Sequence, residues 1–283
     1  MTMRNDPTAR QVRLGTELRR LREAAGMSAK ELAGLLGSSS AHMSQIEAGS
    51  SGISEDRLRR LAAHCACRDE ELINALASMA TERSRGWWEE YRGSLPTAFL
   101  DISELEHHAT FRRDVEFLQI PGLLQTEDYA RALFSFRVPE LPQSELEPRV
   151  SHRMRRRTII EGSHPLPYDT VIHESALRFR VGNRSAARAQ LTHVLELSDS
   201  TSVTVRVIPF DLDGFAGSSS AMVYAGGPVP RLDTVVRDAP HGTGFLDSQA
   251  QLDRFRTLFR RVEELALAPE RSRDFIHKLA KEL

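Results

Sequence analysis

The stretch LRRLREAAGMSAKELAGLLGSSSAHMSQIEAGSSGIS, residues 18–54, decides the fold of the first part of the chain. In it, Ser28 precedes an apolar segment and is followed three residues later by Glu31, which is the signature of a capping box at the start of a helix. Glycines suited to end helices occur at Gly26, Gly37 and Gly49. The spacing therefore predicts short helices joined by tight turns.

The neighbouring residues extend this pattern in both directions. An amphipathic first helix is predicted from Gln11 to Ala25, where apolar residues recur at Val12, Leu14, Leu18 and Leu21. Caps for a third, fourth and fifth helix follow at Ser38 to Ser40, Ser54 and Asp69. The third helix would turn Met43 and Ile46 inward. We therefore expect an all-α, five-helix domain over residues 9–80, in which the second and third helices form a helix-turn-helix.

The region from Leu14 to about Arg68 resembles the DNA-binding domain of the Cro/C1 type, also called the XRE family. The motifs that carry the resemblance are Gly26-Met27-Ser28, Glu31-Leu32-Ala33, and Ser44-Gln45-Ile46-Glu47 followed by Gly49. In that family an arginine of the first helix pairs with a glutamate late in the recognition helix, and Arg22 and Glu47 hold those positions. The resemblance implies a structural ion pair and binding to double-stranded operator DNA.

In such a domain the third helix enters the major groove with its N-terminal end and exposed face towards the base edges. The predicted base contacts are Ser40, Ala41, Ser44 and Gln45. Gln45 is the strongest of them because glutamine offers adenine a paired donor and acceptor. The predicted phosphate contacts are Ser28, Lys30, Ser39 and His42, with backbone donors around Ser51 and Gly52. Ala29 and Gln45 depart from residues that the family often has, so the operator sequence does not follow from the resemblance.

Length, composition and charge limit the remaining choices. A chain of 283 residues is long enough for about two domains, and its 40% hydrophobic and 27% charged residues are typical of ordinary globular proteins. The net charge of −1 gives no global basic signature, although residues 1–30 hold seven Arg and Lys against three Asp and Glu. A nucleic-acid site must therefore be local. No apolar stretch reaches the length of a membrane span and the N-terminus lacks a signal-peptide core, so we expect a cytoplasmic protein.

Residues 81–100 are predicted to form a linker helix between the two domains. This charged stretch contains Trp87 and Trp88, which we interpret as apolar anchors on the second domain, with stacking on a planar ligand as the alternative. Residues 101–283 are predicted as an α+β domain. Its expected strands are 111–120, 170–173, 203–209, 222–225 and 234–237, and its expected helices are 103–109, a helix carrying Tyr129, 144–161, 185–197, 248–266 and 269–283.

Five arginines crowd the predicted helix 144–161, at Arg149, Arg153, Arg155, Arg156 and Arg157. We interpret them as a solvated helix face paired with Glu145, Glu147 and Glu161, with a second nucleic-acid contact as the alternative.

Three runs of the second half resemble the C-terminal domain of unknown function that follows this helix-turn-helix in many actinobacterial regulators: residues 116–134, 202–224 and 267–276. The resemblance supplies an architecture but no ligand, although genes for a small partner protein often lie beside such regulators. A corner of loop and helix N-terminus is predicted within the first run; we interpret it as a corner that closes the fold, with an effector or partner site as the alternative. Its residues are Pro121, Gly122, Gln125, Thr126 and Tyr129.

The sequence offers no support for an enzyme, a metal site or a cofactor. His173, Glu174, His241 and Asp247 hold no catalytic spacing, and nucleotide-binding and zinc motifs are missing. Asp211 to Gly214 imitates a calcium loop without its distal glutamate. The two cysteines, Cys65 and Cys67, are too few for zinc and too close for a useful disulfide, so we expect reduced thiols.

These observations predict a sequence-specific transcriptional regulator. Its C-terminal domain would mediate homodimerisation and sense a small-molecule effector or a small partner protein, because one helix-turn-helix covers too few base pairs to bind tightly alone. The rival interpretation is an antitoxin-like interaction module that binds a small partner protein and regulates its own gene. A third, an enzyme tethered to DNA, would need a polar cleft in the second domain.

Overall fold

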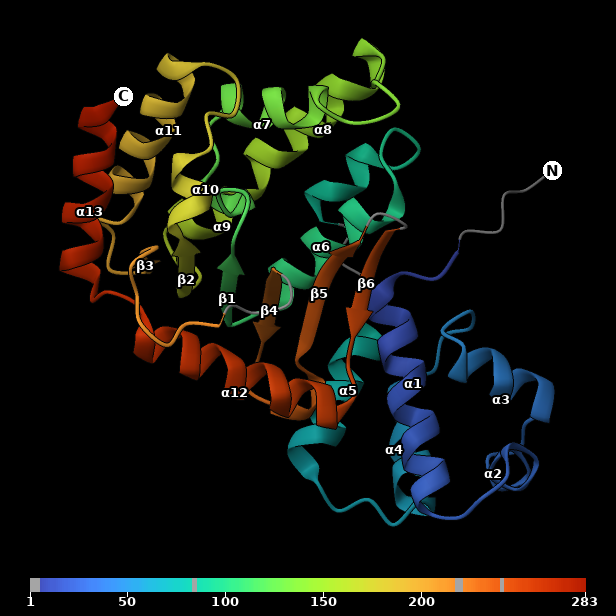
Figure 1. Ribbon diagram of the computed structural model, residues 1–283. Coiled ribbons are helices and arrows are strands. Elements are labelled where there is room, and N and C mark those ends of the chain that lie inside the picture. The colour runs from blue at the N-terminus through green and yellow to red at the C-terminus, as the bar shows by residue number, and fades with distance from the viewer. Residues whose placement is uncertain (1–5, 83–85, 217–220, 240–241) are drawn as a thin grey trace. The chain divides into compact units, whose positions relative to one another are not determined.

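The computed structural model describes residues 6–82, 86–216, 221–239 and 242–283. The chain divides into two compact units, Met1–Trp87 and Trp88–Leu283. Together they show the predicted combination of a helical first domain and an α+β second domain (Figure 1). The predicted ends of the domains, at residues 80 and 101, stay predictions.

The described residues of the first unit form five α-helices: α1 (Ala9–Ala24), α2 (Ala29–Leu35), α3 (Ser40–Glu47), α4 (Glu55–His64) and α5 (Glu70–Thr81). Each begins at a side-chain cap, namely Thr8, Ser28, Ser39, Ser54 and Asp69. The sequence predicts four of these caps. It can do so because the capping hydroxyl or carboxylate accepts a hydrogen bond from an N–H only two or three residues further along the chain. The predicted five-helix arrangement is confirmed.

The core of the first unit is built from one apolar stripe of each helix. Its buried members include Leu14, Leu18, Leu21, Leu32, Met43, Ile46, Leu58, Leu61, Leu72 and Leu76. Val12 was expected in the stripe of the first helix but is 41% exposed. It lies two residues before Leu14, and residues three or four apart, rather than two, share a helix face.

The predicted linker helix over 81–100 is wrong for the residues described. A 3-10 helix covers Trp87–Tyr91 and α6 begins only at Thr97, running to His108. Residues 83–85 lie outside the described part. The helix starts late because Pro96 occupies its N-cap, where the lost N–H costs nothing. Trp88 is buried and its ring lies 5.1 Å from that of His107, which agrees with the interpretation of an apolar anchor.

The second unit is built around a six-stranded mixed sheet (Figure 1). Its strands are β1 (Phe111–Glu116), β2 (Tyr168–His173), β3 (Val203–Ile208), β4 (Met222–Gly226), β5 (Thr234–Ala239) and β6 (Gly242–Leu246), in the order β3-β2-β1-β4-β5-β6. The first three are parallel, and β4, β5 and β6 pair antiparallel. The sequence predicts every strand but β6, although β1 ends four residues earlier than expected.

Helices supply the apolar partners of this sheet. The described helices after α6 are α7 (Glu127–Ser135), α8 (Gln143–Arg156), α9 (Thr158–Glu161), α10 (Glu174–Arg178), α11 (Arg184–Leu197), α12 (Gln249–Leu265) and α13 (Pro269–Glu282). Of these, α8 packs with α7 in a cluster of its own rather than on the sheet. Tyr168 and Ile172 of β2 join a core with α11 and α13, while Val171 between them joins a core with α12. The alternation follows from the two-residue period of a strand. Of the helices described, none is long and apolar enough to cross a membrane.

Candidate nucleic-acid interface

The helix-turn-helix is held by short-range polar contacts at the start of α2 and α3. The Ser28 hydroxyl accepts a hydrogen bond from the Glu31 N–H, and the Glu31 carboxylate accepts one from the Ser28 N–H at 2.7 Å. The Ser39 hydroxyl accepts from the His42 N–H at 3.1 Å. These caps fix where each helix begins, so the direction of α3 is set locally.

Close backbone contact places α1 against the C-terminal end of α3. A Cβ at Gly15 would lie 2.5 Å from the Glu47 carbonyl oxygen and 2.6 Å from that of Ile46. Gly49 ends α3 with a φ of +74°, and a Cβ there would lie 2.7 Å from the backbone of Gln11. Only glycine combines that φ with that space. The two glycines therefore fix the crossing of α1 and α3.

About two helical turns beyond Gly15 on α1, an ion pair joins the same two helices. Arg22 donates to Glu47 through Nε at 2.6 Å and through Nη2 at 2.9 Å, and its Nη1 donates to the Met27 carbonyl at 2.8 Å. The two side chains are 9% and 8% exposed. The hydrogen bond to Glu47 raises the pKa of Arg22, against the effect of burial. The pair is bidentate and charge-assisted, which is the strong form of such a bond.

The outer face of α3 carries the four predicted base contacts. Ser40, Ala41, Ser44 and Gln45 are all exposed, whereas Met43 and Ile46 are buried in the core. The Ser44 hydroxyl donates to the Ser40 carbonyl at 3.0 Å. Within the described part of the chain, the Gln45 carboxamide has no hydrogen-bond partner, so its donor and its acceptor are both available to a base edge.

The predicted phosphate contacts surround this face but differ in what they can offer. Ser28, Lys30, Ser39 and Gly52 are exposed, and His42 and Ser51 are half-buried. The Ser51 N–H already donates to the Gln45 carbonyl at 3.1 Å, and the Ser28 N–H donates to Glu31. Of the backbone donors predicted around Ser51 and Gly52, the Ser51 N–H is thus already used by the C-terminal end of α3, and the phosphate contact itself stays a prediction. Side-chain donors and the backbone N–H of Gly52 remain as the means of contact.

The positive charge of α1 is largely neutralised by glutamates of the same helix. Glu17, which is buried, accepts from Arg13 at 2.7 Å and also from Arg20, and Arg19 pairs with Glu23 at 2.8 Å. Among the described residues, Lys30 has no ion-pair partner. Lys30 can therefore bind a phosphate without breaking an existing ion pair.

In the second unit, the corner predicted as an effector or partner site is closed by internal hydrogen bonds. The Thr126 hydroxyl caps α7 by accepting from the Tyr129 N–H, and the Thr126 N–H donates to Gln190 at 2.8 Å. The Tyr129 hydroxyl accepts from the Ile120 N–H at 3.0 Å. Burial raises the pKa of Tyr129 to about 12. The phenol is thereby kept neutral and bound to the backbone.

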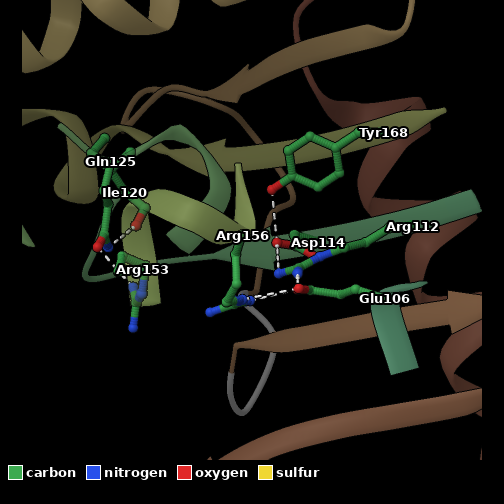
Figure 2. Close-up of polar contacts among 8 residues, drawn as sticks. All are labelled: Glu106, Arg112, Asp114, Ile120, Gln125, Arg153, Arg156 and Tyr168. Atoms are coloured by element: carbon green, nitrogen blue, oxygen red, sulfur yellow. Dashed lines mark hydrogen bonds and ion pairs between the residues drawn. The ribbon is translucent and has the colours of Figure 1, made fainter. Parts of the chain in front are cut away.

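The Gln125 side chain of the corner is equally engaged (Figure 2). The Gln125 carboxamide donates to the Ile120 carbonyl at 2.7 Å and accepts from Arg153 at 2.7 Å. Pro121 is buried, and a Cβ at Gly122 would lie 2.9 Å from the Arg153 guanidinium. The polar groups of the corner thus hold the fold together, and a binding role for it stays a prediction.

Figure 2 also shows a set of charges that the sequence analysis did not find. We call Glu106, Arg112, Asp114, Arg156 and Tyr168 the buried charge network; each is at most 6% exposed. Arg112 donates to Asp114 at 2.8 and 2.7 Å and also to Glu106, Arg156 donates to Glu106 at 2.9 Å, and Tyr168 donates to Asp114 at 2.7 Å. Burial alone raises the pKa of Glu106, but the two guanidinium groups reverse this and lower it. Two cations and two anions thus balance inside the fold.

The prediction of a solvated arginine face on α8 is wrong for part of the helix. Arg149 and Arg156 are each only 6% exposed. Of the three glutamates expected to pair with this face, Glu145 pairs with Arg149 and Glu161 with Arg157, whereas Glu147 binds Arg131 of α7. The helix lies between other elements, so its arginines reach carboxylates that are distant in sequence.

The residues considered for catalysis serve other contacts. Buried Glu174 accepts from the Phe210 N–H at 2.8 Å and pairs with Arg178. His241 lies outside the described residues. The described residues contain no group of His, Cys, Asp and Glu side chains arranged to hold a metal ion, and Cys65 and Cys67 are free thiols.

Two family models match the chain. The first, described as "Helix-turn-helix domain", matches residues 13–76, and the second, "Domain of unknown function (DUF5753)", matches residues 99–278. The chain belongs to the DUF5753 family. Its DUF5753 domain follows an XRE-like helix-turn-helix, as the two resemblances in the sequence predict. The helix-turn-helix match indicates a DNA-binding regulator rather than an enzyme. No curated protein and no solved structure matches the chain.

Proposed function

We propose that this DUF5753 protein is a transcriptional regulator that reads a specific operator through α3 and binds it as a homodimer. The DUF5753 domain would hold the two copies together and respond to an effector or to a small partner protein. Ser40, Ala41, Ser44 and Gln45 would face the bases, and Lys30 with the neighbouring serines and His42 would contact phosphates.

The observation that carries the proposal is the division of α3 into two faces. Met43 and Ile46 anchor the helix in the core while four small or polar side chains point outward from it. A helix whose inner face is fixed and whose outer face is polar and sterically open fits the major groove. The Gln45 carboxamide is the group on this face best suited to distinguish one base from another.

Dimerisation is supported by the size of the reading surface. One helix of eight residues contacts only a few base pairs, and two half-sites one DNA turn apart provide the affinity and specificity that one lacks. Linking two readers raises the effective concentration of the second on DNA already bound by the first.

The test begins with selection of DNA from a random pool by the full-length protein, which should enrich a sequence with two related half-sites. Gln45→Ala should then lose roughly 1 to 3 kcal/mol on the selected site and relax the preference at one base position in each half-site. Lys30→Ala should weaken all sequences alike and lower the slope of log affinity against log salt by about one.

Asn74→Ala is the matched control, because Asn74 is an exposed carboxamide on α5 of the same unit. It should leave both the affinity and the base preference unchanged. If no sequence is enriched, or if Gln45→Ala binds every variant of the selected site like the parent protein, then α3 does not read bases as proposed.

A further inference from the structure

The sheet of the DUF5753 domain ends in two edge strands, β3 and β6 (Figure 1). An edge strand presents a row of N–H and C=O groups that invites pairing with another strand. At β3, part of this row is used inside the domain. The Val207 N–H donates to the Ser272 hydroxyl at 3.0 Å, and the Leu267 N–H donates to the Val207 carbonyl at 2.9 Å. The segment that leads into α13 therefore covers this edge.

The other edge strand, β6, has a neighbouring strand on one side only in the described sheet. It pairs antiparallel with β5, from Val235 opposite Leu246 to Ala239 opposite Gly242. Every second residue of such a strand directs its N–H and C=O away from the neighbour. Gly242 and Gly244 are exposed, and the other three residues of β6 are half-buried. The groups that β6 directs outward are those to which a further strand binds.

The composition of β6 does not protect this edge. Natural edge strands are commonly guarded by lysine, by other charged residues or by proline. The five residues of β6, GTGFL, include none of these. Pairing of β6 with a second copy of itself would therefore place no like charges directly opposite each other.

The order of small and bulky residues makes β6 complementary to itself. In an antiparallel pair centred on Gly244, this glycine lies opposite its own copy. Leu246 then lies opposite Gly242 of the second copy, and Phe245 lies opposite Thr243 of the second copy. Because directly opposite side chains contact each other, each bulky side chain meets a small one. Such a pairing has a two-fold axis and buries the same surface on both copies.

The packing of the domain itself gives no reason for a glycine at position 244. Gly242 has a φ of +136°, which favours glycine, whereas Gly244 has no positive φ. Among the described atoms, the nearest to a Cβ on Gly244 would be the Arg237 carbonyl oxygen, at 3.9 Å, which is an ordinary contact. Glycine weakens a strand, and inside one it often marks a place where another backbone approaches closely. Gly244 lies at the centre of the pairing, where the two backbones would meet.

We propose that β6 is the homodimer interface of the DUF5753 domain. It pairs antiparallel with β6 of a second copy about a two-fold axis at Gly244, and it thereby joins the two sheets into one. This inference rests on the proposed function in that it names the surface of the proposed homodimer. The pairing itself can be measured without DNA.

Opposite charges placed at the axis test the pairing in the full-length protein. The space around Gly244 accepts a Cβ, so Gly244→Lys and Gly244→Glu should keep the parent's circular dichroism. In either variant two like charges would meet across the axis, and sedimentation equilibrium should show roughly fivefold weaker dimerisation. An equimolar mixture of the two variants places Lys opposite Glu. It should dimerise roughly fivefold more tightly than either variant alone, which a misfolded variant would not do.

Gly227→Lys and Gly227→Glu are the matched controls. Gly227 directly follows β4, which lies inside the strand order, and a Cβ there would meet no described atom within 4 Å. These variants should dimerise like the parent, both separately and mixed.

A cross-link gives a second measurement of the register. In Gly244→Cys, the two thiols at the axis should lose two protons and two electrons to diamide and form a disulfide between the copies. Mass spectrometry should then find the peptide that contains position 244 joined to its own copy. The same treatment of Gly227→Cys should give no such product at position 227.

The proposal is overturned if the parent stays monomeric with and without the selected DNA, if Gly244→Lys dimerises like the parent, or if mixing it with Gly244→Glu restores nothing. Absence of the cross-link at position 244 likewise overturns it. A dimer that binds its operator but is indifferent to charges at position 244 refutes the β6 interface alone. A dimer that responds to these charges but enriches no DNA sequence refutes the proposed function alone.

Discussion

The ion pair between Arg22 and Glu47 gives the sharpest prediction for the first unit. Glu47→Ala removes both acceptors of the bidentate contact and leaves the Arg22 guanidinium with the Met27 carbonyl and the exposed Glu23 carboxylate at 3.6 Å. Both side chains are more than nine-tenths buried, so water replaces the lost carboxylate poorly. Removing one partner of such a pair costs about 3 to 5 kcal/mol. That is a large part of the roughly 5 to 15 kcal/mol that stabilises a typical domain.

Hydrogen exchange of the α1 and α3 amides in the full-length protein measures this loss for the first unit alone. We expect the slowest amides of Glu47→Ala to exchange at least roughly a hundredfold faster, because a factor of ten corresponds to about 1.4 kcal/mol. Arg19→Ala is the matched control, because it leaves the contacts of Arg22 in place. It breaks an ion pair of α1 whose side chains are 61% and 51% exposed, and such pairs contribute at most about 1 kcal/mol.

Unchanged protection of α1 and α3 in Glu47→Ala, together with abolished DNA binding, would refute this reasoning. Glu47 would then act at the DNA surface rather than by joining two helices. Glu47→Gln keeps one carbonyl acceptor and should fall between the parent and Glu47→Ala.

Two further predictions concern stability. Gly15→Ala should destabilise the first unit by about 1 to 3 kcal/mol, since the new Cβ would meet backbone carbonyls of α3. Gly34→Ala has open space around the new Cβ and should be neutral or stabilising by up to about 1 kcal/mol. Hydrogen exchange measures both changes. Burial, followed by the charge of Arg156, lowers the pKa of His152 to about 3. The unfolded chain therefore takes up this proton first, and stability is retained above about pH 6.5 but falls towards pH 3 by at most about 1.4 kcal/mol per pH unit. His152→Gln should flatten that decline in urea titrations, and an unaltered pH profile would contradict a neutral buried His152.

The first unit could be predicted closely because its signals are local. A serine or aspartate at a helix start acts on an N–H two or three residues away, so Ser28, Ser39, Ser54 and Asp69 mark real helix starts. The hydrogen bond from the Ser51 N–H to the Gln45 carbonyl is also local, yet the sequence does not predict it. It depends on the geometry of the turn at the end of α3 rather than on residue type.

The second unit was harder because its decisive contacts are distant in sequence. Arg156 meets Glu106 fifty residues earlier, so the arginines of α8 were expected in water. Arg112 and Asp114 carry a signal of the buried charge network in the sequence. They are opposite charges two residues apart on one strand, so they lie on the same face of the sheet and can pair. Strand β6 went unnoticed because glycine and threonine interrupt any apolar alternation in Gly242–Leu246.

The buried charge network has a consequence for how this domain can change over time. A single substitution at Glu106, Arg112, Asp114 or Arg156 leaves one charge without its opposite in the interior, whereas joint replacement by apolar residues of similar volume keeps the balance. We therefore expect the four positions to change together. Among DUF5753 domains they should be kept together or lost together, and a relative that lacks one of them should carry a compensating change at another.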